Sequence, residues 1–94
     1  MRQIIVSTSF KRALKRLLRQ KLDMRERIRE RLVLLESDPF MPRLRTHRLK
    51  GKLSGAWSCS VEYDCRIVFK FVKTQGLDED AVFLIDIGSH DDVY

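Results

Sequence analysis

Apolar residues at regular spacing organise the start of the chain into a short strand and a helix. The run Ile4–Val6 is typical of a strand, and Ser7 or Ser9 just behind it is a suitable helix N-cap. The apolar side chains that follow recur every three or four residues, as on one face of an amphipathic helix. They are Phe10, Ala13, Leu14, Leu17 and Leu18. Lysines and arginines fall on the other side, so the pattern predicts a helix with one buried and one basic face.

A second helical stretch follows, with signals at both ends. Asp23 is suited to cap its start, and Asp38-Pro39 is expected to end it, because proline disfavours helical backbone in the residue before it. Its apolar side chains lie along one face: Met24, Ile28, Leu32 and Leu35. Two consecutive amphipathic helices predict a helical hairpin that lies against a sheet.

After the basic loop 41–48 the period changes to two. Apolar and polar residues alternate on both sides of residues 63–65, which is typical of two half-buried strands. We predict a three-residue turn there, because it sets Cys59 opposite Phe69 and keeps the apolar residues of both strands on one face. A two-residue turn sets Cys59 against Val68 instead.

The last strand and the order of elements define the fold class. Ala81–Ile87 is apolar on both faces, as expected of a central strand that is buried on both sides. The predicted order is β-α-α-β-β-β. Because the final strands follow one another through hairpins, we expect an α+β fold with a mostly antiparallel sheet and the helices on one face. The other face is left to hold polar groups. At 94 residues, 1–94 should form one domain with one core.

Charge is divided unevenly between the two parts of the chain. Residues 1–50 hold 15 Lys/Arg against 5 Asp/Glu, a net of +10, whereas residues 51–94 hold 4 against 8, a net of −4. This asymmetry favours a polyanion as partner of the basic part. An acidic protein would be attracted to the same surface, and a solvated basic helix gives the same pattern without any partner.

The remaining composition points to the cytoplasm. No apolar run approaches the roughly 18 residues of a membrane span, and the opening apolar run is shorter than that of a secretory signal. The two cysteines, Cys59 and Cys65, have no zinc-binding spacing, and in a cytosolic protein we expect both to be free thiols.

Several side chains of the second half are suited to cleaving an RNA phosphodiester. Attack by the neighbouring 2′-hydroxyl needs one group to remove its proton, another to protonate the leaving 5′-oxygen, and cations beside the phosphate. Histidine titrates near neutral pH, and the chain has two, His47 and His90. Asp64 can act as a base or hold a histidine in one tautomer, and Arg66 can hold the phosphate.

Other basic and aromatic residues can contact the nucleic acid around these groups. The candidate RNA-binding residues are Arg45, Arg48, Lys50 and Lys52. Tyr94 and Trp57 can stack on bases. Two structural alternatives stay open: Arg66 forms a cross-strand ion pair with Glu62, and Trp57 belongs to the core.

Three groups of residues carry a resemblance to a known family. They are His47-x-Leu49-x-Gly51 with Leu53-x-Gly55-x-Trp57, then Val61-Glu62-x-Asp64 with Arg66-Ile67-Val68-Phe69, and the ending Gly88-Ser89-His90-x-x-Val93-Tyr94. In their order and spacing, over nearly the whole chain, they resemble the RelE/ParE superfamily of bacterial type II toxin–antitoxin toxins. The similarity is strongest to its YafQ-like branch.

The resemblance implies a RelE-like fold and a ribosome-dependent mRNA endonuclease that inhibits translation, works without a metal and is neutralised by a cognate antitoxin. His47, Asp64, His90 and Tyr94 match functional positions of the YafQ-like pattern. Arg66 matches an arginine that the wider group carries at the start of this strand. His90 is the leading candidate for the acid/base group. The expected partners are mRNA on the ribosome, ribosomal RNA and an antitoxin.

The chain departs from the YafQ-like pattern at three positions. Ser60 stands where that branch has a further histidine, Cys65 where it has a tryptophan, and Asp86 where its last strand has an arginine. Charge stabilisation then depends on Arg66 or on the basic run 43–52. Two other functions remain as alternatives: a ParE-like inhibitor that binds DNA gyrase and does no chemistry, and a non-toxic regulator that binds nucleic acid.

Overall fold

The chain folds into two helices and a five-stranded sheet, in the order β1(Ile4–Val6), α1(Thr8–Gln20), α2(Arg25–Ser37), β2(His47–Arg48), β3(Trp57–Glu62), β4(Cys65–Val72) and β5(Ala81–Gly88). The structure is a computed structural model that describes residues 1–62, 64–76, 78–89 and 93. Short 3-10 turns occur at η1(Leu22–Met24), η2(Pro42–Leu44) and η3(Gly51–Leu53). Strand β2 is an addition to the predicted order, and it falls where we expected a loop.

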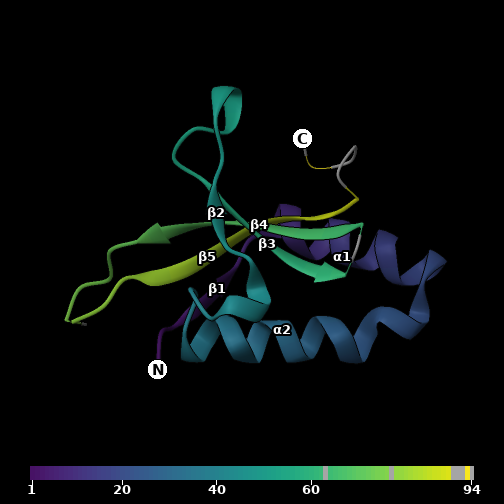
Figure 1. The fold of residues 1–94 in the computed structure, drawn as a ribbon, viewed down its shortest axis with the longest axis horizontal. Helices are drawn as coiled ribbons and strands as arrows, with labels where there is room; N and C mark the ends of the chain where they lie inside the picture. The colour runs from purple at the N-terminus through teal and green to yellow at the C-terminus, as the bar shows by residue number, and fades with distance from the viewer. Residues whose placement is uncertain (63, 77, 90–92, 94) are drawn as a thin grey trace.

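The sheet has the strand order β1-β5-β4-β3-β2. Strand β1 runs parallel to β5, and all the other neighbouring pairs are antiparallel. The predicted α+β class, with a mostly antiparallel sheet, is therefore confirmed. Figure 1 shows α2 running along one side of the sheet, while the β2–η3 segment projects on the opposite side of the view. None of the helices described here is long and apolar enough to cross a membrane.

The main core lies between the two helices and one face of the sheet. Phe10 and Ala13 of α1, with Ile28 and Leu35 of α2, are almost fully buried. They pack against sheet residues that alternate along the strands, as the period of two predicted. These are Cys59, Val61, Ile67, Phe69, Val82, Leu84 and Ile87. The prediction that β5 is central and buried on both faces is also confirmed: it lies between β1 and β4, with Val82, Leu84 and Ile87 in the main core and Ile85 packed on the opposite face.

The two helices begin differently from each other. The Ser7 side chain accepts a hydrogen bond from the Phe10 N–H at 3.0 Å, so one of the two predicted caps of α1 is confirmed. The predicted cap of α2 is wrong. Asp23 lies inside η1, and the residue that precedes α2 is Met24, which makes no side-chain cap bond. The 3-10 turn takes the place of a cap because it leads the backbone directly into the helix. Asp38 ends α2 as expected.

The register of the β3–β4 hairpin corrects our prediction. Glu62 pairs with Cys65 across a two-residue turn, and the register then shifts between Ser60 and Glu62. Beyond this irregularity Cys59 lies opposite Ile67, two residues away from the predicted partner Phe69. A β-bulge adds one residue to one strand, and here it keeps Val61 and Cys59 both buried despite the shorter turn. Either unbulged turn is therefore wrong, whereas the rule that apolar residues share one face is confirmed.

The face of the sheet away from the helices holds a second, small apolar cluster. Ala56, Val68 and Val93 are buried there, with Leu49 and Ile85 packed against them. Ser58 is completely buried on the same side of the sheet, since its register partner is Val68. This face is therefore less open than we expected, because the segment after β2 and the residue Val93 cover part of it.

Candidate active site

A basic pocket lies at the end of the β3–β4 hairpin, where β3 continues past the two-residue strand β2. Its volume is about 590 Å³. It is lined by Arg31 of α2, by Arg43 and Arg45 in and after η2, and by Ser60, Val61, Glu62, Asp64 and Arg66 of the hairpin. Four guanidinium groups and two carboxylates give the lining a net positive charge. Such a lining favours an anionic ligand.

Arg66 is positioned in this pocket by the neighbouring strand. Its Nη1 donates to the Ser60 Oγ at 3.0 Å and approaches the Glu62 carbonyl oxygen at 3.4 Å. The structural alternative, an ion pair between Arg66 and Glu62, is wrong, because Arg66 lies opposite Ser60 and the Glu62 side chain pairs with Arg27 of α2. The guanidinium of Arg66 is thus held by neutral oxygen atoms.

The other arginines of the pocket are anchored on the helix side. Arg31 donates from Nε to the Val61 carbonyl oxygen at 3.3 Å. Arg31 and Arg43 both contact Glu30, with N–O separations of 3.3 and 2.8 Å. Arg45 has a positive φ of 51°, an uncommon conformation for a residue other than glycine. Its N–H bonds to the Pro42 carbonyl oxygen at the end of η2.

His47 lies beside the pocket without lining it. It is exposed on β2 and pairs with Ser58 of β3. Its Nδ1 is 3.1 Å from the carbonyl oxygen of Arg45, which does line the pocket. Because a carbonyl oxygen only accepts hydrogen bonds, Nδ1 carries the proton in this contact. In the neutral ring, Nε2 is then the nitrogen that can take up a proton.

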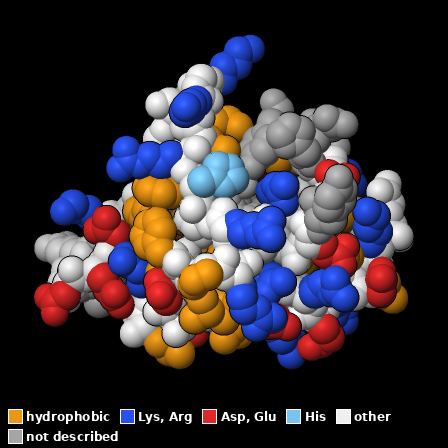
Figure 2. Space-filling model, in the orientation of Figure 1, with side chains coloured by type: hydrophobic (Ala, Val, Ile, Leu, Met, Phe, Trp, Pro, Cys, Tyr) orange, Lys and Arg blue, Asp and Glu red, His pale blue; other side chains and the backbone are white. Residues whose placement is uncertain are grey.

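The remaining predicted RNA-binding residues form a separate group. Arg48 follows His47 on β2, and its guanidinium lies over the Trp57 ring, 5.1 Å from the centroid. Lys50 and Lys52 line a shallow hollow with Leu49 and Leu53 on the projecting segment around η3. Figure 2 shows Lys and Arg side chains spread over this face of the molecule, from the projecting segment to the helices.

The structure thus brings together Arg66, Asp64 and Arg45 of the predicted site, with His47 adjacent through Arg45. His90 and Tyr94 lie outside the described residues. Arg31 was not predicted, although a signal existed. It stands three residues after Ile28 and four before Leu35, so it is a charged residue within the apolar stripe of α2.

Both cysteines are free thiols, as predicted, and both are buried. Burial raises the pKa of the Cys59 thiol from its ordinary value of 9.0 to about 12, and burial likewise raises that of Cys65 to about 11. The thiolate is the reactive form, so neither side chain is a nucleophile near neutral pH. Within the described ranges, no group of three or more His, Cys, Asp and Glu side chains could hold a metal ion.

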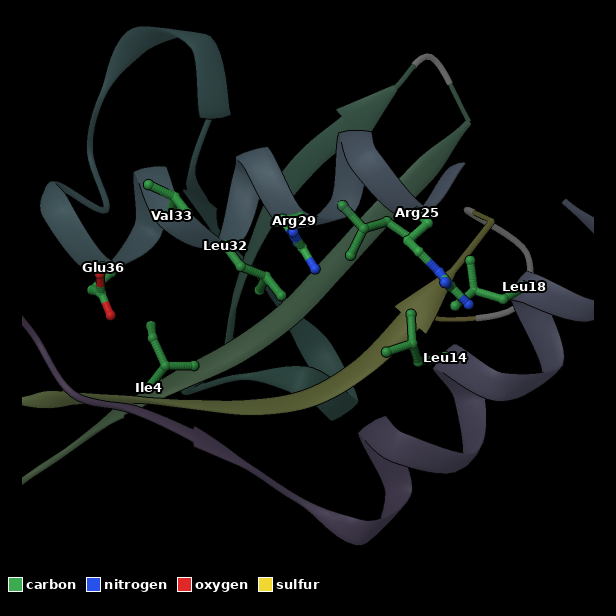
Figure 3. Close-up of a pocket in the computed structure, with 9 residues that line it drawn as sticks. Ile4, Leu14, Leu18, Arg25, Arg29, Leu32, Val33 and Glu36 are labelled. Carbon is green, nitrogen blue, oxygen red and sulfur yellow. The ribbon is translucent and has the colours of Figure 1, made fainter. Parts of the chain in front are cut away.

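An apolar groove of about 500 Å³ lies away from the basic pocket, between α1, α2 and β1. Figure 3 shows the Arg25 side chain of α2 extending toward Leu14 and Leu18 of α1, with Leu32 farther along α2 near Ile4 of β1. Val33 on its rim is 53% exposed. The groove can accommodate apolar side chains of another molecule, with cations available at its edge.

Comparison with known proteins identifies the family of this fold and site. A metal-bound toxin from Helicobacter pylori is 27% identical, with a TM-score of 0.78 over 100% of both chains. YafQ from E. coli, at 19% identity, has the same fold, with a TM-score of 0.78 over 100% of this chain and 99% of that one.

The E. coli DinJ–YafQ toxin–antitoxin complex contains a chain of the same fold, at 20% identity, with a TM-score of 0.77 over 99% of this chain and 97% of that one. No curated protein sequence matches the chain. The family described as the YafQ bacterial toxin of type II toxin–antitoxin systems matches residues 2–94. The chain therefore belongs to the YafQ family of bacterial type II toxins.

Proposed function

We propose that the chain is a ribosome-dependent mRNA endoribonuclease that stops translation by cutting messages. The observation that carries this proposal is the basic pocket, in which Arg66 lies with three further arginines beside the carboxylate of Asp64. A phosphodiester entering this pocket would meet cations at the position where negative charge develops during cleavage. Preorganised charge of this kind often makes the largest contribution to catalysis.

The proposed reaction uses the substrate's own 2′-hydroxyl. A base removes the hydroxyl proton, the oxygen attacks the adjacent phosphorus, and an acid protonates the departing 5′-oxygen. The products are a 2′,3′-cyclic phosphate and a free 5′-hydroxyl. Arg66 holds the non-bridging oxygens of the phosphate, and Arg48 and Lys50 guide the strand beyond it.

We assign proton transfer to His90, His47 and Asp64, with His90 as the leading group on the basis of the family pattern. For His47, the Nδ1 contact with the Arg45 carbonyl oxygen supports this role, because it directs the basic Nε2 away from the backbone. Tyr94 is assigned to orient a nucleotide, and Arg45 and Lys52 to contact the RNA backbone. His90→Ala should abolish growth arrest while the protein stays folded.

The arginines of the basic pocket can replace the positive charge of the arginine that the YafQ-like pattern has in the last strand and that this chain lacks. Asp86 stands at that position, and its carboxylate accepts a hydrogen bond from the Ile87 N–H at 2.9 Å. It adds negative charge where the YafQ-like pattern has a cation. Asp86 does not line the basic pocket, and Arg31, Arg43 and Arg45, which do line it, can supply the missing positive charge there.

A comparison of two cations on one strand tests the proposal. Arg66→Ala should lower the rate of cleavage of a translated message by about 10²–10³-fold, the usual cost of losing one group that stabilises developing charge. Arg66→Lys should recover only part of the activity, because an ammonium cannot make the same paired contacts. Lys70→Ala is the matched control: Lys70 is exposed on β4, four residues away, and does not line the pocket.

Primer extension on messages after brief induction measures these rates, and a message without a start codon reports the need for translation. Wild-type cleavage that Arg66→Ala leaves unchanged would remove the pocket from the mechanism. Intact messages together with broken DNA would instead indicate a ParE-like gyrase inhibitor. Binding to polyanions without growth arrest would indicate a regulator.

We further propose a cognate antitoxin as the partner that neutralises the toxin. The basic surface and the apolar groove both suit an acidic, partly apolar segment, and the DinJ–YafQ structure is a toxin–antitoxin complex of a protein with this fold. A small acidic product of the neighbouring reading frame should co-purify with the chain and restore growth. A neighbouring product with neither effect would contradict this assignment.

A further inference from the structure

Three aromatic side chains meet at the surface near β2, and we call Phe40, Trp57 and Phe71 the aromatic patch. The Phe40 ring lies edge-on to Trp57 at 5.3 Å and stacked with Phe71 at 5.8 Å between centroids. Trp57 and Phe71 are in turn 5.6 Å apart. Trp57 and Phe71 pack against the core, but Phe40 is 51% exposed. The patch is therefore continuous with the core at its base and open to solvent at Phe40.

Two arginines accompany the aromatic patch. The guanidinium of Arg48 lies 5.1 Å from the centre of the Trp57 ring, and that of Arg2 lies 5.3 Å from the centre of Phe71. Arg48 is exposed, so the outer face of its planar group is available. Aromatic rings and guanidinium planes are the surfaces on which proteins stack unpaired RNA bases. An apolar patch that served only to close the core would need neither cation.

The aromatic patch is connected to the basic pocket along one strand. Trp57 pairs with Arg48, the next residue Ser58 pairs with His47, and Ser60 further along β3 lines the pocket. From Trp57 to Ser60 the strand advances about 10 Å, at roughly 3.3 Å per residue. Successive residues point to opposite faces, so the Ser58–His47 pair lies on the face away from the helices and the Trp57–Arg48 pair on the helix face. Because β2 is the edge strand of the sheet, a nucleic-acid strand that passes from the pocket over this edge would reach Arg48 and the aromatic patch.

We infer that the aromatic patch, with Arg48, is a stacking site for an unpaired base of single-stranded RNA next to the scissile linkage. The inference deepens the proposed function, and it rests on that function for its choice of RNA as the ligand. The observations favour RNA over an apolar protein segment, because a guanidinium lies across the ring that such a segment would cover.

The chain provides its own reporter, because Trp57 is its only tryptophan. The ligand is a short single-stranded 2′-O-methyl oligoribonucleotide, which the enzyme cannot cut because the attacking hydroxyl is blocked. A second oligomer of equal length lacks the bases and keeps the phosphates. With the wild-type chain, the first oligomer should change Trp57 emission in a saturable way. The abasic oligomer should bind more weakly and leave the emission almost unchanged.

Three variants locate the binding. Phe40→Leu keeps an apolar side chain and removes the ring, and it should weaken binding of the base-containing oligomer by about 5- to 150-fold, the usual range for losing one stacked base. Arg48→Lys keeps the charge but loses the plane, so it should weaken this oligomer and leave the abasic one unaffected. Leu22→Ala is the control, since Leu22 is 65% exposed on η1 and outside the patch.

Thermal unfolding followed by circular dichroism checks that each variant is folded. Arg48→Lys removes no core atom, so a loss of binding in this variant would not be caused by unfolding. Equal affinity of wild type, Phe40→Leu and Arg48→Lys for the base-containing oligomer would overturn the inference. So would an emission change caused by the antitoxin and absent with RNA, which would assign the patch to that protein. Because the oligomer cannot be cleaved, the binding result is independent of whether the chain is a nuclease.

Discussion

At the scale of single residues, Ser60 is a positioning residue for Arg66. Its Oγ accepts the 3.0 Å hydrogen bond that directs the guanidinium into the basic pocket. Ser60→Ala removes this acceptor without changing the backbone, and a lost hydrogen bond costs about 0.5–1.5 kcal/mol. We therefore expect message cleavage to slow by about 2- to 12-fold. Single-turnover cleavage on programmed ribosomes measures the effect.

A double-mutant cycle distinguishes positioning from a general loss of structure. If Ser60 acts through Arg66, adding Ser60→Ala to Arg66→Ala should cause no further loss of rate. Equal losses in both backgrounds would show that Ser60 acts by another route. Ser54→Ala is a suitable control, because Ser54 is an exposed serine next to η3 and does not line the pocket.

The chemistry of individual residues was the part of the site most accessible from the sequence. Arg66, Asp64 and Arg45 were singled out by type and motif, and they line one pocket. Whether Arg66 would meet Glu62 or Ser60 depended on the bulge in β3, and alternation of residue types carries no information about a bulge. The sequence shows Arg31 as a charged position within the apolar stripe of α2. That Arg31 lines the pocket follows only from the packing of α2 on β3.

At the scale of elements, the two helix starts make opposite predictions. Ser7 caps α1 by accepting the Phe10 N–H, so Ser7→Ala should lower the free energy of unfolding by about 1 kcal/mol. Asp23 lies in η1 and makes no cap bond to α2, so Asp23→Ala should cost only a few tenths of that value. Urea denaturation of both variants, followed by circular dichroism, tests the pair. An Asp23→Ala cost equal to that of Ser7→Ala would restore Asp23 as a cap.

Helices and strands with strong periodicity could be predicted from the sequence, whereas the short strand β2 and the register between β3 and β4 could not. The helices and the long strands repeat their apolar pattern several times, so each repeat supports the next. Strand β2 contains only His47 and Arg48, which is too short for any period to appear. The β3–β4 register depends on which residues the helices cover, and this is decided by tertiary packing rather than by the hairpin sequence.

At the scale of the whole molecule, the open question is whether RNA responds to net charge or to the local charge of the basic pocket. The chain has a net charge of +6, and many of its cations lie on the exposed side of α1, outside the pocket. Arg43→Ala with Arg45→Ala, and Lys11→Ala with Lys15→Ala, both reduce the net charge by two, from +6 to +4. The two double variants are therefore matched in charge and differ only in where it is lost.

Salt dependence of binding separates the two possibilities. Each phosphate contact with single-stranded nucleic acid contributes about −0.7 to the slope of log affinity against log salt. If Arg43 and Arg45 each hold a phosphate, their removal should reduce the magnitude of the slope by about 1.4, since two contacts of 0.7 are lost. The α1 double variant should keep the wild-type slope with the uncleavable oligomer. Equal slopes for both double variants would show that the strand follows the overall field of the protein and does not occupy the pocket.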